Sequence, residues 1–228
     1  LGEAKPEVIY NTATGFTADT FEQITAADPT QIIAVNQAVD ARTKESLEEI
    51  APVTVKPDDY EDWQVPWEKQ VETIADAVGK KDEGDKLIDD TEKAFEEFRH
   101  EHAELQDKSA AIVMPYDGKI GLYTEEDGRG QFIENLGMEI PDALQGDGGS
   151  FFVDIAPENY AKLNQVDYLF VLDYNGSSEA LKKDKTFQGL DIVKDGRVRY
   201  LDTDTGNAMS MPNPVTIPWA VDKFEEKL

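Results

Sequence analysis

The stretch LYTEEDGRGQFIENLGM, residues 122–138, contains the residue pattern best suited to binding chemistry. A β-prone run meets three acids, then a Gly-Arg-Gly turn at 128–130, then a segment typical of a helix. The turn is a poor nucleotide phosphate loop. A dinucleotide fingerprint needs a third glycine where Ile133 stands, and no lysine follows in a GxxxxGK pattern.

The residue of this stretch that could contact a ligand is Arg129. At a helix N-terminus, backbone N–H groups and a guanidinium together favour anionic oxygens. The alternative is structural, with Arg129 paired with Glu125 or Glu126 in the turn. The sequence favours neither interpretation over the other.

Other catalytic and metal-binding patterns find little support. His100 and His102 are two residues apart, so on one helix their side chains diverge and make a poor metal site. They support no Ser-His-Asp triad either. The absence of cysteine excludes disulfides and thiolate ligands. Residues 202–207, DTDTGN, lack the glycine that a calcium loop needs at its sixth position, and Asn213 stands where its glutamate would be, so we interpret them as a turn.

Aromatic and methionine side chains gather where predicted strands end. Trp63, Tyr123 and Tyr174 fall in segments after such strands, as do Met209 and Met211. A single aromatic residue is usually part of a core, but several at strand carboxyl ends fit an amphipathic ligand cleft. The sequence leaves both interpretations open.

Composition narrows the class of protein. The formal net charge of −26 excludes a nucleic-acid partner, because phosphate binding needs clustered Lys and Arg. No run reaches the ~20 apolar residues that a membrane helix needs. No signal peptide is visible. Because the chain opens on LGEAKPEVIY, a turn followed by a short strand, we expect the gene product to begin earlier.

Three parts follow from the alternation of strand-like and helix-like segments: an incomplete N-terminal lobe at 1–80, a single helix at 81–106 and a C-terminal lobe at 107–228. Short apolar runs predict strands at 7–10, 31–35, 53–55, 110–114, 120–124, 168–172 and 198–201. Helical patterns are found at 20–27, 42–50, 67–78, 131–136, 157–163 and 218–226. This alternation predicts α/β lobes with parallel sheets.

The helix at 81–106 carries one narrow apolar stripe on an otherwise charged surface. At ~1.5 Å per residue it is long enough to connect two lobes. We therefore expect two Rossmann-like lobes with central sheets, bridged by this helix, and a ligand cleft between them outside the carboxyl ends of the strands. Trp67, which begins an amphipathic helix, is expected in the core.

Taken in order, several segments resemble those of bacterial substrate-binding proteins that serve ferric-siderophore ABC transporters. They are FEQITAADPTQIIAV (21–35), LEEIAPVTV (47–55), WEKQVETIADAVGK (67–80), GRGQFIENLGM (128–138), FFVDIAPENYAKLNQVDYLFVLDY (151–174), DGRVRYLD (195–202) and NPVTIPWAVDKFEEKL (213–228). The resemblance extends over almost the whole chain. Each segment alone is weakly specific for the family, whereas the complete set in this order is strongly specific.

The resemblance implies a binding protein, not an enzyme, that captures a ferric siderophore and delivers it to a membrane permease. Because the siderophore holds the iron, no cofactor and no protein metal site are expected. The protein would be monomeric and extracytoplasmic, either a cell-surface lipoprotein or periplasmic. The alternatives are a haem or cobalamin binding protein of the same fold and, in another class, a carboxylate-based hydrolase using the cleft.

Two positions bear on the kind of siderophore. Arg129 matches a family arginine that often faces the ligand, whereas Tyr174 stands where some catecholate-binding members carry a second arginine. Triscatecholate and citrate complexes are anionic, so one arginine in an acidic chain makes a poor receptor for them. A neutral or cationic ferric hydroxamate is therefore favoured.

The remaining expected ligand contacts are aromatic, amide and thioether groups. Tyr123, Tyr174 and Trp63 would pack on the organic frame of the chelate. Asn36, directly after the predicted strand at 31–35, would hydrogen-bond to it from the first lobe. The cleft lining would also include two methionines, Met209 and Met211.

Overall fold

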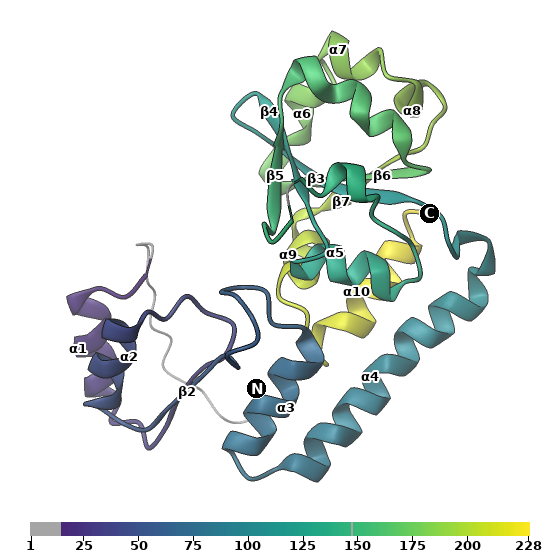
Figure 1. Ribbon diagram of the computed structural model, residues 1–228. Helices are drawn as coiled ribbons and strands as arrows, with labels where there is room; N and C mark the ends of the chain where they lie inside the picture. Colours follow the sequence, from purple (N-terminus) through teal and green to yellow (C-terminus); the bar gives the residue numbers. More distant parts are fainter. Residues whose placement is uncertain (1–14, 147) are drawn as a thin grey trace. The chain divides into compact units, whose positions relative to one another are not determined.

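The computed structural model describes residues 15–146 and 148–228 (Figure 1). The chain divides into two compact units. The first contains the residues up to Val65 together with Lys69–Lys81, and the second contains Pro66–Glu68 and Asp82–Leu228. The predicted strand at 7–10 lies outside the described residues.

The first unit alternates helices and strands as the sequence predicts. Its elements are α1 (Ala18–Ala26), β1 (Ile32–Ala34), α2 (Ala41–Glu48), β2 (Val53–Val55) and, from Lys69 onward, α3 (Trp67–Ala77). β1 and β2 pair in parallel, with Ile32 opposite Val53. The side chain of Asp40 caps α2 by accepting a hydrogen bond from the Thr43 N–H at 2.7 Å. Trp67 is buried, as expected.

The second unit begins with the long helix α4 (Lys81–Glu101), followed by the short η1 (Ala103–Leu105). Its strands are β3 (Ala110–Tyr116), β4 (Lys119–Tyr123), β5 (Phe152–Ile155), β6 (Tyr168–Asp173) and β7 (Val198–Asp202). Its other helical segments are α5 (Gly128–Asn135), η2 (Asp142–Leu144), η3 (Pro157–Gln165), η4 (Tyr174–Gly176), α6 (Ser178–Leu181), α7 (Lys185–Gln188), α8 (Asp191–Lys194), α9 (Thr203–Ser210) and α10 (Thr216–Glu225).

The sheet of the second unit has the strand order β5-β4-β3-β6-β7 and is mixed, not parallel throughout as predicted. β3, β6 and β7 run parallel, whereas β4 is antiparallel to both β3 and β5. The cause is a two-residue turn, Asp117-Gly118, with φ of 45° and 73°. Positive φ at both positions is typical of a type I′ hairpin, which returns the chain antiparallel.

Both faces of this sheet are covered by helices (Figure 1). On one face, alternate residues of β3 and β6 such as Val113 and Leu169 form a core with η3 and the α6–α8 region, including Leu163 and Phe187. On the other face, Phe170 of β6 packs on Phe224 of α10, with 4.5 Å between ring centroids. The predicted α/β class is confirmed.

The sequence interpretation of residues 202–207 as a turn is wrong. They begin α9, where the Asp202 side chain accepts a hydrogen bond from the Thr205 N–H at 2.9 Å. Thr205, Gly206 and Met209 of this helix are buried. Packing therefore stabilises a helix whose residues have low intrinsic helix propensity.

Candidate functional site

The Gly-Arg-Gly segment forms the first turn of α5, which follows β4 after the short connection at 124–127. Asp127 caps this helix: its Oδ1 accepts a hydrogen bond from the Arg129 N–H at 2.8 Å. Gly130 is required by close packing, because a Cβ there would overlap the carbonyl oxygen of Thr124. The glycine thus lets α5 approach the strand end and fixes where Arg129 emerges.

The Arg129 guanidinium is held by three side chains. Nη1 donates to both carboxylate oxygens of Asp127, at 3.0 and 3.1 Å. Nε and Nη2 donate to the Tyr174 hydroxyl at 3.4 and 3.2 Å. The guanidinium carbon lies 4.1 Å from the centroid of the Tyr123 ring, a cation–π contact. The carboxylate partner is therefore Asp127, not Glu125 or Glu126 as the structural alternative supposed.

The ion pair is largely shielded from solvent, with the Arg129 and Asp127 side chains 14% and 12% exposed. Burial raises the pKa of the Asp127 carboxyl, and the neighbouring guanidinium opposes that rise. Burial also raises the pKa of Tyr123 to about 12, again opposed by Arg129. Tyr123 is therefore a neutral phenol at physiological pH, and its hydroxyl donates to Met114 Sδ at 3.6 Å.

Tyr174 reaches Arg129 because the chain bends sharply after β6. Asn175 has a φ of 53°, and its N–H donates to Thr203 Oγ1 at 3.1 Å. The Tyr174 hydroxyl lies 2.8 Å from the position that a Cβ on Gly206 would occupy. A glycine in α9 thus makes room for the tyrosine that contacts Arg129.

The structure brings together three of the predicted contacts, Tyr123, Arg129 and Tyr174. Met209 lies in α9 and is fully buried, so it packs inside the second unit. Met211 follows the last turn of α9 and is 49% exposed. The sequence placed both methionines in a loop, whereas the first belongs to a helix.

The other two predicted contacts, Asn36 and Trp63, belong to the first unit. Asn36 lies in the turn directly after β1, and its buried Oδ1 accepts no hydrogen bond from the described residues. Trp63 is 37% exposed and has a positive φ of 68°. The Asn36 amide oxygen is thus unpaired but shielded from solvent, whereas the Trp63 indole is partly exposed.

Sequence reasoning missed two members of the Arg129 cluster, Asp127 and Met114. The sequence offered only a weak signal for Asp127, because the helix was predicted to start at 131 and three consecutive acids precede the turn, whereas α5 starts at Gly128 and makes Asp127 its N-cap. No sequence signal identified Met114. Met114 lies close to Tyr123 because of the register of the β3–β4 hairpin. In that register Met114 is opposite Gly121, and Ile112 is opposite Tyr123.

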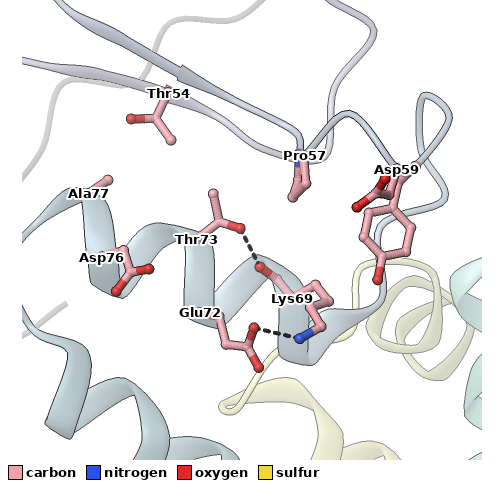
Figure 2. Close-up of a pocket in the computed structure, with 9 residues that line it drawn as sticks. Thr54, Pro57, Asp59, Lys69, Glu72, Thr73, Asp76 and Ala77 are labelled. Atoms are coloured by element: carbon pink, nitrogen blue, oxygen red, sulfur yellow. Dashed lines mark hydrogen bonds and ion pairs between the residues drawn. The ribbon is translucent and has the colours of Figure 1, made fainter.

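A separate groove of about 620 Å³ lies within the first unit, between the segment around β2 and α3 (Figure 2). It is lined by Thr54, Pro57, Asp59, Tyr60, Lys69, Glu72, Thr73, Asp76 and Ala77. No predicted ligand contact lines it. Its lysine donates to Glu72 at 2.7 Å, so the lining is acidic overall and unsuited to an anion.

Within residues 15–146 and 148–228, no group of three or more His, Cys, Asp or Glu side chains is arranged to hold a metal ion. In the same part of the chain, no helix has both the length and the apolar character needed to cross a membrane.

The fold and this cluster agree with one protein family. The pattern of the family described as periplasmic binding protein matches residues 5–205. The chain therefore belongs to this family, and the expected relationship is confirmed.

Particular relatives carry more specific names. The chain is 26% identical over 223 residues to the iron(3+)-hydroxamate-binding protein YxeB of Bacillus subtilis (strain 168), spanning 91% of this chain and 65% of that protein's length. It is similar to the iron uptake ABC transporter substrate-binding protein PiaA of Streptococcus pneumoniae TIGR4, with a TM-score of 0.78 and 26% identity over 95% of this chain and 75% of that one. PiaA in complex with ferrichrome gives a TM-score of 0.77 and 26% identity over 90% and 71% of the two chains.

Proposed function

We propose that this protein binds a ferric siderophore of the hydroxamate type and delivers it to the permease of an ABC importer. The observation that carries the proposal is the paired state of Arg129, whose charge is balanced by Asp127 at 3.0 Å. A balanced guanidinium offers hydrogen-bond donors without a net positive charge. That combination suits the oxygens of an uncharged chelate.

The chemistry of a ferric hydroxamate matches the cluster. Three hydroxamates, each with one negative charge, neutralise the ferric ion, and their outward oxygens accept hydrogen bonds. Free N–H positions of Arg129 would donate to these oxygens, while the faces and edges of Tyr123 and Tyr174 would pack on the organic frame. Asn36, Trp63 and Met211 are proposed as further contacts, with Met209 supporting them from the core.

The relatives support the same ligand class. YxeB is named for iron(3+)-hydroxamate binding, and PiaA has been crystallised with ferrichrome. Membership of a family of binding proteins supports a role without catalysis. It also supports an extracytoplasmic location, as a lipoprotein or in the periplasm, and a permease as the partner that accepts the ligand.

Haem and cobalamin are less well supported. The Tyr123 hydroxyl already donates to Met114 Sδ, and burial raises the pKa of Tyr123 to about 12, so its conversion to a phenolate axial ligand would be costly. Met209 is buried, which removes its thioether from a ligand surface. No described contact singles out a corrinoid.

The proposal is tested by tryptophan fluorescence on the full-length gene product. The titrants are ferrichrome, a second ferric hydroxamate, a ferric triscatecholate, ferric citrate, haem and cobalamin, with each iron-free siderophore as control. We expect saturable one-to-one quenching, strongest with the hydroxamates. Tight binding of haem or cobalamin alone, or of no titrant, would overturn the proposal.

A further inference from the structure

Asp127 performs two roles with one carboxylate. Its Oδ1 caps α5 through the Arg129 N–H at 2.8 Å, and the same oxygen lies 3.0 Å from Arg129 Nη1. Capping alone needs only a small polar side chain, and asparagine is as good a cap as aspartate. The negative charge of Asp127 is therefore not required to begin the helix.

That charge has a clear electrostatic effect on Arg129. Both side chains are largely buried, so water and salt screen their interaction weakly. The guanidinium keeps its five N–H groups but, with the carboxylate beside it, presents a dipole instead of a net charge. Nη2 retains a second N–H beyond the one directed to Tyr174. Hydrogen bonding to a ligand oxygen remains open, while attraction of an anion is reduced.

We propose that Asp127 sets the charge selectivity of the ligand site, by balancing Arg129 so that a neutral ferric hydroxamate is accepted and an anionic ferric catecholate is disfavoured. The inference rests on the proposed function, since it concerns which ferric chelate the Arg129 cluster accepts. It assigns Asp127 as a specificity-determining residue that acts through Arg129.

The test is Asp127→Asn, which keeps the cap and the size of the side chain but removes the charge. Ferrichrome, with no charge on its iron centre, and a ferric triscatecholate, with three negative charges there, are titrated into wild type and variant. We expect the ratio of catecholate affinity to ferrichrome affinity to rise about tenfold or more, with this change decreasing as salt is added.

Asp184→Asn is the matched control. Asp184 caps α7 by accepting from the Thr186 and Phe187 N–H groups at 2.7 and 3.0 Å, and no described arginine or lysine pairs with it. This change alters the net charge of the protein by the same amount. If both variants gain catecholate affinity equally, the effect comes from net charge, and the inference is wrong.

A second variant connects the effect to Arg129. In Asp127→Asn combined with Arg129→Gln, no unbalanced guanidinium remains, so the gain in catecholate affinity should disappear. Thermal unfolding of each variant confirms that it is folded, and Asp127→Ser, which also caps, replaces Asp127→Asn if that variant does not fold. If wild type binds ferrichrome and selectivity is unchanged in the Asp127 variant, only this inference fails. If no variant and no wild type binds a ferric chelate, the proposed function fails, and the inference with it.

Discussion

The guanidinium carbon of Arg129 lies 4.1 Å from the centroid of the Tyr123 ring, while the Tyr123 hydroxyl donates to Met114 Sδ at 3.6 Å. Tyr123 is thus fixed at both ends, by the sheet and by its hydroxyl, and it presents a ring face to the cation. Such a platform restricts the rotamers of Arg129 before any ligand arrives. Less conformational entropy then remains to be lost on binding.

This arrangement predicts different effects for two substitutions of Tyr123. Tyr123→Leu removes the cation–π contact, and we expect ferrichrome affinity to fall about 3- to 30-fold, corresponding to roughly 0.5–2 kcal/mol. Tyr123→Phe keeps the ring and should bind within about threefold of wild type. Isothermal titration calorimetry measures both. Equal affinities for the two variants would show that the ring does not position Arg129.

Gly130 is predicted to tolerate no side chain, because a Cβ would overlap the Thr124 carbonyl oxygen, a backbone atom that cannot rotate away. Gly130→Ala should lower the free energy of unfolding by at least about 2 kcal/mol. Gly189→Ala is the control, since the nearest atom to its Cβ would be 3.2 Å away and its φ is −77°. We expect less than about 1 kcal/mol there. Urea unfolding followed by circular dichroism compares them, and similar losses would contradict the packing argument.

We expect His102 to make a pH-dependent contribution to the stability of the folded state. Its ring nitrogens lie 2.9 Å from Glu225 and 3.5 Å from Glu104. Burial lowers the pKa of His102, but the hydrogen bonds to these two carboxylates outweigh it and raise the pKa above 6.5. A raised histidine pKa stabilises the folded state below pH 6.5, and this contribution is lost as the pH rises through the folded-state pKa.

The measurement compares wild type with His102→Gln between pH 5 and pH 9. The variant should be less stable at pH 5, by no more than about 1 kcal/mol because the pair lies near the surface, and should approach wild type at high pH. His100→Gln, on the exposed side of α4, is the control and should follow wild type throughout. A constant difference at every pH would mean that His102 contributes only by packing against Phe98.

Glu134 on α5 should make the stability of the folded state fall with rising pH, whereas a salt-bridged acid makes it rise. Partial burial and the charges of Glu125, Glu139 and Glu126 raise the pKa of Glu134 to about 7. Because the folded state retains this proton when the unfolded chain has lost it, stability falls as the pH rises from about 4.5 to about 7 and is then level.

Glu134→Gln should therefore be more stable than wild type at pH 8 and nearly equal to it at pH 4. Urea midpoints at the two pH values provide the comparison, with Glu96→Gln on the exposed face of α4 as control. A gain in stability that is the same at both pH values would exclude titration of Glu134 as its cause.

The sequence predicted the elements of the fold better than their directions. The strand at 53–55 and the start of α3 at Trp67 are observed as predicted. The reversed direction of β4 was not predicted, because an apolar run carries no information about strand direction, and β5 (Phe152–Ile155) was not predicted as a strand. The information lay in the Asp117-Gly118 turn, whose left-handed backbone determines the hairpin.

The candidate site, too, could be predicted from the sequence only in part. Arg129 and its aromatic neighbours could be selected from residue type and position after strands. The partner carboxylate could not, because three consecutive acids precede the turn and only the capping geometry of α5 selects Asp127. Helix α9 was missed because its stability comes from burial and from the Asp202 cap, not from the propensities of its residues.

The close approach of the Tyr174 hydroxyl to Gly206 also constrains how this protein can evolve. Because the hydroxyl lies only 2.8 Å from the place of a β-carbon at 206, the acceptability of a mutation at one position depends on the residue at the other. We expect Gly206→Ala to displace the tyrosine hydroxyl from Arg129, and to be better tolerated once a smaller residue has replaced the tyrosine. Lineages that retain the tyrosine are expected to retain the glycine, so that the order of mutations, and not only their identity, decides which binding sites descend from this one.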